Sequence, residues 1–277
     1  MKPVLEVENL SFSYQKRPVL REISFQVNPG EFLAVVGPNG CGKTTLMKNI
    51  LKHVRPAEGR IRIQGKDISS LEGRGFARQV AAVLQTIDPS SMTVREYVML
   101  GRLPFFQRYQ FFETKADEEI ARHYMELTGV AGMADARVSE ISGGERQLAA
   151  IAKGLTQEPS LLVMDEPTSH LDITHQVRIL DLINRLRKEL KLTVLMVLHD
   201  LNLASEYCDR LVLLDKRTGK IFHSGTPADV LTESAIQEVY QTRVKVYPNP
   251  VTQKPWIFLV SNIQDQETQL TSNPSKE

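Results

Sequence analysis

Short apolar segments alternate with amphipathic segments along most of this chain. The segment FLAVVG, residues 32–37, is almost wholly apolar, which is typical of a strand that is buried on both faces of a parallel sheet. Similar segments recur over residues 80–84, 161–164, 193–198 and 210–214. Helical spacing of apolar residues is present over residues 43–54, 172–190 and 201–208. This order of strands and helices predicts an α/β core with a parallel sheet.

The N-terminal segments have a different, alternating pattern. Residues 4–10 and 21–27 alternate apolar and polar side chains, and we expect a turn around Lys16-Arg17-Pro18 to join them. Residues 59–65 form a further expected strand. These strands predict an antiparallel β subdomain beside the core.

The middle of the chain is mainly helical in pattern. Its clearest helices are expected over residues 93–102 and 114–130. We therefore predict one domain over residues 1–240. Its core would comprise residues 1–86 and 156–240, with a helical subdomain inserted over about residues 87–155.

The C-terminal extension, residues 241–277, has a weaker pattern. Residues 243–247 and 256–260 are expected to pair as strands. Residues 264–277 are polar and are expected to be disordered.

The composition is that of a soluble globular protein. The 34 basic and 33 acidic residues give a net charge of +1, which argues against a nucleic-acid partner held by a basic surface. Cys41 and Cys208 do not form a metal-ligand cluster and suit a reduced cytosolic setting. No apolar segment approaches the ~20 residues of a membrane helix, and the N-terminus does not resemble a signal peptide. We expect a soluble chain, which leaves room for docking onto a partner that spans a membrane.

A glycine-rich segment, GPNGCGKTT at residues 37–45, lies between an apolar strand and a helix. It fits the pattern G-x-x-x-x-G-K-[ST], in which a curled backbone and a helix N-terminus present N–H groups to phosphates. An ordinary glycine turn is the alternative, which this context disfavours. Lys43 is expected to reach the β- and γ-phosphates, and the Thr44 hydroxyl to ligate Mg²⁺. The predicted ATP-binding residues of the loop are Gly37, Pro38, Asn39, Gly40, Cys41, Gly42, Lys43, Thr44 and Thr45.

Two carboxylates follow the apolar strand at residues 161–164. Asp165 is expected at the carboxyl end of the sheet, beside the phosphate loop, where it suits the Mg²⁺ shell. Glu166 can reach an attacking water as general base. An acidic turn before Pro167 is the alternative, and it loses weight once the phosphate loop is present upstream.

A second helix start carries two glycines, in the segment ISGGERQ at residues 141–147. Ser142 and Glu145 have the spacing of a capping box. That box does not account for Gly143 and Gly144, because glycine is a poor helix former. We interpret this turn as a second anion site, which a ligand approaches closely. One nucleotide already has its phosphates in the first loop, so the second site is expected to face the nucleotide of another copy of the chain.

These motifs together resemble those of a known protein family. ISGGERQ is similar to the signature motif of ATP-binding-cassette (ABC) ATPases, and residues 4 to 240 carry the family's motifs in order. The resemblance implies that Tyr14 stacks on adenine and that Gln85 contacts Mg²⁺ and the attacking water. It also implies that Asp172 lies in the D-loop of SHLD and that His199 contacts the γ-phosphate. Ile141 and Glu145 depart from the family's commoner Leu and Gln.

The resemblance further implies a head-to-tail homodimer that closes on two ATP molecules with Mg²⁺. The catalytic residues would be Glu166, His199 and Gln85, and the metal ligands Thr44, Gln85 and Asp165. Ser142, Gly143, Gly144 and Glu145 would face the ATP held by Lys43 of the other protomer.

The resemblance extends to one transporter branch. The segments at 171–183, 199–214 and 225–240 are similar to the ATPases of importers for iron–siderophore, haem and cobalamin, and the stretch around His175 and Gln176 is the most typical of that branch. It implies integral membrane permease subunits, an extracytoplasmic binding protein that acts indirectly, and a peripheral place on the cytoplasmic face of the membrane.

Other classes of ATPase remain as alternatives. An exporter subunit would differ around residues 172–176. A soluble cassette acting on DNA or ribosomes would carry a coiled-coil insertion or a second cassette, and a metabolic kinase would lack the turn at 142–145.

The segment GRLPFFQRYQFF, residues 101–112, places aromatic residues between Arg102 and Arg108. Packing within the helical subdomain is one interpretation. A surface that faces a protein partner is the other, because aromatic residues and arginine are enriched at interfaces.

Overall fold

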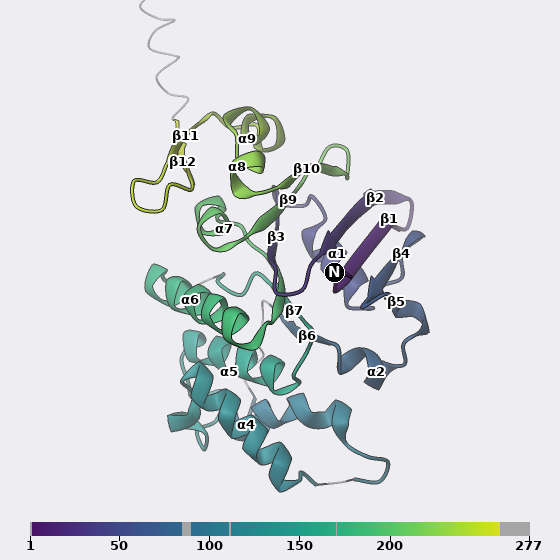
Figure 1. Cartoon of the computed structure of the whole chain (residues 1–277), viewed down its shortest axis with the longest axis vertical. Helices are drawn as coiled ribbons and strands as arrows, with labels where there is room; N and C mark the ends of the chain where they lie inside the picture. Colours follow the sequence, from purple (N-terminus) through teal and green to yellow (C-terminus); the bar gives the residue numbers. More distant parts are fainter. Residues whose placement is uncertain (1, 85–89, 111, 170, 261–277) are drawn as a thin grey trace, which may run out of the picture.

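A six-stranded sheet forms the centre of the protein, in a computed structural model that describes residues 2–84, 90–110, 112–169 and 171–260 (Figure 1). The strand order is β10-β9-β3-β8-β7-β6, in which β10 is antiparallel to β9 and the other neighbours are parallel. The strands are β3 (Phe32–Val36), β6 (Val80–Val83), β7 (Leu161–Asp165), β8 (Thr193–Val197), β9 (Arg210–Leu214) and β10 (Ile221–Gly225). The five predicted core strands are confirmed, and β10 is an addition to them.

An antiparallel sheet of order β2-β1-β4-β5 lies beside the central sheet. Its strands are β1 (Leu5–Tyr14), β2 (Arg17–Val27), β4 (Glu58–Ile63) and β5 (Lys66–Asp67). The predicted β subdomain is therefore confirmed. The connecting turn lies at Gln15 and Lys16, earlier than expected, because β1 and β2 continue their pairing to Tyr14 and Arg17.

Helix α1 (Lys43–Ile50) packs between the two sheets. Its Leu46, Met47 and Ile50 belong to the same buried cluster as Leu33 and Val35 of β3. The alternate β3 residues, Phe32, Ala34 and Val36, face a second cluster formed with the remaining large helices. Both faces of the central sheet are thus covered, which explains why its strands are almost continuously apolar.

The other face of the sheet carries α5 (Gly143–Thr156), α6 (Ile173–Leu190), α7 (Leu201–Tyr207), α8 (Pro227–Val230) and α9 (Glu233–Tyr240). A helical lobe lies below the sheet in Figure 1, with α3 (Val94–Met99), η2 (Leu100–Phe105), α4 (Lys115–Thr128) and η3 (Ala131–Met133) next to α5. The helix predicted over 93–102 ends sooner than expected and continues as a 3₁₀ segment that contains Pro104. The proposed domain limits near 87 and 155 stay a prediction.

The predicted pairing of strands in the C-terminal extension is confirmed. Strands β11 (Val244–Pro248) and β12 (Pro255–Leu259) form an antiparallel hairpin. The hairpin packs on α7, where the Ser205 hydroxyl donates to the Pro255 carbonyl at 2.7 Å. The expected disorder of residues 264–277 lies outside the described residues. The remaining short elements are η1 (Ile68–Ser70) and α2 (Gly73–Ala77).

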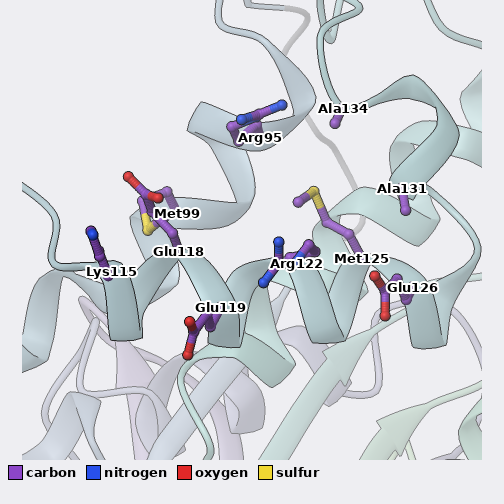
Figure 2. A pocket seen from close by; sticks show the side chains of 10 residues that line it. All are labelled: Arg95, Met99, Lys115, Glu118, Glu119, Arg122, Met125, Glu126, Ala131 and Ala134. Atoms are coloured by element: carbon purple, nitrogen blue, oxygen red, sulfur yellow. The ribbon is translucent and has the colours of Figure 1, made fainter.

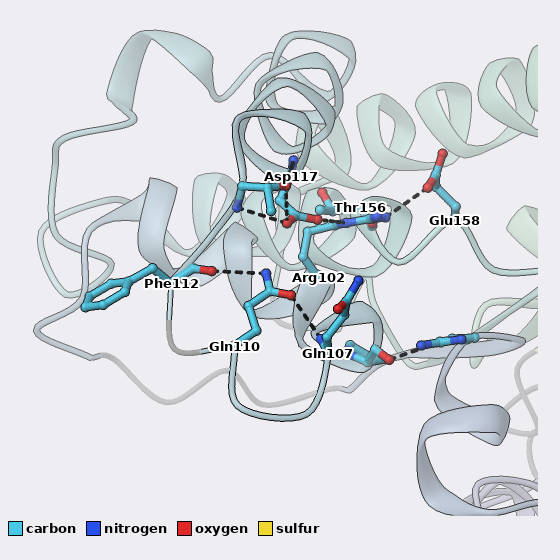
Figure 3. A network of polar contacts seen from close by, with 10 residues as sticks. Arg102, Gln107, Gln110, Phe112, Asp117, Thr156 and Glu158 are labelled. Carbon is cyan, nitrogen blue, oxygen red and sulfur yellow. Dashed lines mark hydrogen bonds and ion pairs between the residues drawn. The ribbon is translucent and has the colours of Figure 1, made fainter.

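Arg102 is buried inside the helical lobe, which favours packing within the helical subdomain over a partner-facing role for this residue (Figure 3). Its guanidinium pairs with Asp117 at 3.0 Å and Glu158 at 2.9 Å, and it also donates to the Thr156 carbonyl at 3.0 Å. The guanidinium also lies 4.0 Å from the Phe105 ring centroid. Arg102 therefore ties η2 to the start of α4 and the end of α5, while Tyr109 and Phe112 remain exposed.

Among the described residues, no helix combines the length and the apolar character that crossing a membrane requires.

Candidate functional site

The phosphate loop connects the end of β3 to the start of α1. Gly42 immediately precedes α1 with a φ of 106°, and a Cβ atom there would lie 2.7 Å from the Leu20 side chain of β2. Both the backbone angle and the close packing therefore require glycine. Within the described residues, no side chain caps α1, and its first turn has no acidic residue. The first N–H groups of α1 are thus presented without a competing carboxylate, as an anion site needs.

Lys43 lies inside the curl of this loop. Its buried ammonium donates to the carbonyl oxygens of Gly37 at 2.7 Å and Pro38 at 3.2 Å. These bonds hold a positive charge at the centre of the loop. Cys41, in the same loop, is buried, and burial raises the pKa of its thiol. We therefore expect little thiolate at Cys41 and slow reaction with thiol reagents.

A cavity of about 200 Å³ brings together residues from four separate segments. The lining residues are Val19, Asn39, Gly40, Gly42, Lys43, Thr44, Thr45, Glu166 and His199. The phosphate loop, the end of β7 and the end of β8 therefore meet at one place, at the carboxyl edge of the parallel strands, where ligands of α/β sheets bind. Val19, from β2, had no signal in the sequence that pointed to this site.

Tyr14 is not among the described residues that line this cavity. It lies at the end of β1, is 43% exposed and packs edge-on against Phe12 with ring centroids 4.9 Å apart. Its predicted contact with adenine stays a prediction. Gln85, predicted as a catalytic and metal-binding residue, lies outside the described residues.

Asp165 ends β7 as a buried carboxylate. In the described part of the chain its Oδ1 atom is buried without a hydrogen-bond partner. Burial raises the pKa of Asp165, and the neighbouring Glu166 carboxylate raises it further, against the opposing effect of Lys43. A buried oxygen of this kind fits a hard divalent cation. Thr44, which is exposed to the cavity, could supply a second oxygen ligand.

Replacing Asp165 by Asn is expected to stabilise the ligand-free protein against thermal unfolding at neutral pH. A carboxyl whose folded-state pKa is raised stabilises the fold fully below its ordinary value of 3.8 and loses that contribution as pH rises through the folded pKa. At pH 7, Asp165→Asn should therefore raise Tm by roughly 2 °C without Mg²⁺ or nucleotide. The gain should shrink as the pH falls toward 3.8.

The matched control for this thermal-unfolding series is Asp135→Asn, a side chain that is 87% exposed. Its Tm should stay within about 0.5 °C of wild type. A lower Tm for Asp165→Asn at pH 7 would show that the buried carboxylate is satisfied and would contradict this interpretation of the site.

Glu166 follows Asp165 in a left-handed backbone conformation with a φ of 51°. This conformation is uncommon for residues other than glycine and is found preferentially at functional sites. The Glu166 carboxylate pairs with His199 Nε2 and accepts a hydrogen bond from the Ser169 hydroxyl at 3.1 Å. Ser169 is the first residue of the SHLD segment, in which the sequence analysis assigned a role to Asp172 only. The arrangement places an oriented carboxylate beside the phosphate loop, where it could accept a proton from water.

His199 follows β8 and precedes α7. Asp200 caps α7 by accepting hydrogen bonds from the backbone N–H groups of Asn202 at 2.8 Å and Leu203 at 3.0 Å. The cap fixes the turn in which His199 projects toward Glu166. The side chain of His199 is 43% exposed, so it can exchange the carboxylate for another acceptor in the cavity.

The predicted capping box at the start of α5 is confirmed. The Ser142 hydroxyl donates to Glu145 Oε2 at 2.7 Å and accepts from the Glu145 N–H at 3.3 Å. The Ser142 hydroxyl and N–H hold the pKa of Glu145 below its usual range. The carboxylate of Glu145 therefore serves the helix end in this structure.

The two glycines of this turn, Gly143 and Gly144, have different surroundings in the folded chain. A Cβ atom at Gly143 would meet no heavy atom within 4 Å, so this glycine leaves an open approach to the helix N-terminus. A Cβ atom at Gly144 would lie 2.5 Å from Cδ2 of His175 in the same chain. The contact with His175 already excludes a side chain at Gly144, and the expected approach of a ligand to Gly144 stays a prediction.

Asp172 is the N-cap of α6. It accepts from the His175 N–H at 2.9 Å, which holds its pKa below the usual range. His175 is thus placed between Asp172 and Gly144. The spacing of Asp172 and His175 along the chain, which is typical of a helix N-cap, is visible in the sequence. The contact between His175 and Gly144 is visible only in the folded chain.

A second hollow, of about 420 Å³, lies in the helical lobe between α3 and α4 (Figure 2). Basic and acidic side chains surround it, namely Arg95, Lys115, Arg122, Glu118, Glu119 and Glu126. None of these charged residues lines the cavity beside the phosphate loop, called the phosphate cavity below, so the two hollows are separate features.

Comparison with known proteins gives consistent matches over most of the chain. The ABC transporter family matches residues 20–169. The ferric enterobactin transport ATP-binding protein FepC of Escherichia coli (strain K12) is 37% identical over 257 residues, which cover 91% of this chain and 93% of FepC. The iron(3+)-hydroxamate import ATP-binding protein FhuC of Bacillus subtilis (strain 168) is 34% identical over 268 residues, covering 96% of this chain and 98% of FhuC.

A solved structure agrees with these sequence matches. It is described as a metal-chelate type ABC transporter in an inward-facing conformation, and it superposes with a TM-score of 0.83 at 26% identity. The superposition covers 95% of this chain and 100% of that chain.

Proposed function

This chain belongs to the ABC transporter family, and we propose on that premise that it is the ATP-hydrolysing subunit of an importer for an iron–siderophore or a related metal chelate. The observation that carries the proposal is the shared cavity in which Lys43, Glu166 and His199 meet. ATP hydrolysis uses a cation that binds the phosphates, a carboxylate that accepts a proton from water and a histidine that contacts an oxygen of the transferred phosphoryl group.

Each segment has a defined part in the proposed reaction. The N–H groups at the start of α1 and the ammonium of Lys43 bind the phosphates. Glu166 takes a proton from the attacking water. His199 leaves the Glu166 carboxylate and contacts the γ-phosphate instead. Mg²⁺, held by Thr44 and Asp165 and in the family pattern by Gln85, would neutralise charge on the phosphates. The Oδ1 atom of Asp165, which has no hydrogen-bond partner among the described residues, supports this assignment.

The proposed assembly is a head-to-tail homodimer. The N-terminus of α5 has an open approach at Gly143, so it can receive the phosphates bound by Lys43 of a second copy. Asp172 would lie at the same interface. Binding of ATP by both protomers then favours the closed dimer, and hydrolysis removes that preference.

The motion would be passed to integral membrane permease subunits on the cytoplasmic face of the membrane. The exposed side chains of Leu103, Tyr109 and Phe112, together with the charged hollow between α3 and α4, are the candidate contact surface. An extracytoplasmic binding protein would deliver the cargo without touching this chain.

The cargo proposal rests on the relatives, two of which carry ferric enterobactin and iron(3+)-hydroxamate in their names. Uptake tests it directly. In cells of the source organism that lack this gene, labelled ferric siderophore, haem and cobalamin are offered in parallel. We expect siderophore uptake to be lost and to return with the wild-type gene but not with Glu166→Gln. Loss of haem or cobalamin uptake alone would overturn the siderophore assignment, and loss of none would favour an exporter or a soluble cassette ATPase.

A further inference from the structure

The first turn of α6 carries two side chains that point back to the loop after β7. Gln176 Nε2 donates to the carbonyl oxygens of Thr168 at 3.2 Å and Leu171 at 3.1 Å. One amide group therefore fastens two points, Thr168 and Leu171, of the segment that follows β7. Ser169 of this loop also donates to Glu166, so the fastened segment includes the support of the proposed general base.

His175 makes a second connection from the same turn. Its Nδ1 atom lies 2.9 Å and 3.0 Å from the two carboxylate oxygens of Asp172. Because Asp172 also accepts the His175 N–H, the imidazole is held in one orientation against the end of the loop. The half-buried ring cannot turn freely without losing these contacts.

The opposite edge of the imidazole packs on α5. A Cβ atom at Gly144 would lie 2.5 Å from Cδ2 and 3.1 Å from Nε2 of His175. Contacts closer than ordinary van der Waals distance would force one of the two segments to move. Helices α5 and α6 lie next to each other in Figure 1, and this contact joins their N-terminal ends.

We propose that His175 and Gln176 are positioning residues that lock the described loop residues 166–169, 171 and 172 to the N-terminus of α5 within one protomer. This inference rests on the proposed function, because the two locked segments meet a nucleotide together only in the proposed dimer. When Gly143 closes on the nucleotide of the partner, the lock carries the loop with it. The approach of one protomer's α5 is thereby tied to the placement of that protomer's own Glu166.

The proposed lock gives a reason for glycine at position 144 that is independent of the approach of a ligand. Gly144 is required by His175, so substitution at Gly144 should be harmful only while the imidazole is present. If a phosphate required glycine at position 144, that glycine would be needed whether or not His175 is present. The two explanations give opposite results in a double-mutant cycle.

The experiment measures steady-state ATP hydrolysis and KM for MgATP in the full chain. His175→Ala and Gln176→Ala should each lower kcat about tenfold while KM changes less than about twofold, since neither residue is among the described residues that line the cavity beside the phosphate loop. His175→Asn should recover at least about half of the lost kcat, because its amide can donate to Asp172. Thr174→Ala, an exposed position in the same helical turn, is the matched control and should keep wild-type values.

The decisive comparison is Gly144→Ala with and without His175→Ala. We expect Gly144→Ala alone to lower kcat about 100-fold and the double variant to return to the level of His175→Ala alone. An equal loss from Gly144→Ala in both backgrounds would overturn the lock, as would full activity of His175→Ala and Gln176→Ala. Failure of the wild-type chain to hydrolyse ATP would contradict the proposed function instead, and thermal unfolding of each variant separates a loss of fold from a loss of positioning.

Discussion

The Glu166→Gln variant is expected to bind MgATP and to hydrolyse it about a thousand times more slowly than the wild type. The amide preserves the size of the side chain and can still bond with His199 and Ser169, so the cavity keeps its shape. It cannot accept the proton of an attacking water. Nucleotide should therefore remain bound, and the closed homodimer should accumulate.

Three measurements check this expectation. Phosphate release gives kcat, binding of a labelled nucleotide gives affinity, and light scattering gives the mass with and without MgATP. Glu113→Gln, at an exposed carboxylate, is the matched control and should behave as wild type. A Glu166→Gln chain that keeps about a tenth or more of the turnover would show that another group takes the proton.

The Gly143→Arg variant is expected to bind ATP with wild-type affinity and to lose about 99% of its hydrolysis. The open space around Gly143 accommodates a long side chain without disturbing the folded protomer. In the proposed dimer that same space receives the partner's nucleotide, so the new side chain would obstruct closure. The loss should appear in kcat and in dimer formation rather than in the affinity of the isolated protomer.

Gly132→Arg supplies a matched control, because a Cβ atom at Gly132 also meets no heavy atom within 4 Å. It lies in η3, away from the phosphate cavity, and its activity should be unchanged. If Gly143→Arg hydrolysed ATP as fast as Gly132→Arg, the N-terminus of α5 would have no part in the reaction.

Periodicity and motif spacing predicted most of the architecture. The core strands are short, apolar and bounded by polar turns, so their positions were within about two residues of the structure. The boundaries of the helix after residue 93 were wrong, because Pro104 and the buried Arg102 shape a 3₁₀ segment that helical periodicity does not reveal.

The site was predictable where the chemistry is local in the chain. The phosphate loop, the capping box of Ser142 and the acidic pair at 165–166 each carry their signal in a few adjacent residues. The positive φ of Glu166 and the contact between Gly144 and His175 depend on how distant segments pack. No spacing rule connects residues 144 and 175, so the reason for the second glycine required the folded structure.

The central claim is that each ATP is hydrolysed between Lys43 of one protomer and Gly143 of another. Mixing two inactive chains tests it most directly. A dimer of Lys43→Ala with Gly143→Arg contains one site with both defects and one site with neither, if the protomers pair head to tail. The account predicts that single-turnover hydrolysis in an equal mixture recovers to about a quarter of the wild-type amplitude, since about half of randomly paired dimers are mixed and each has one intact site. A mixture no more active than either variant alone would contradict a site shared between protomers.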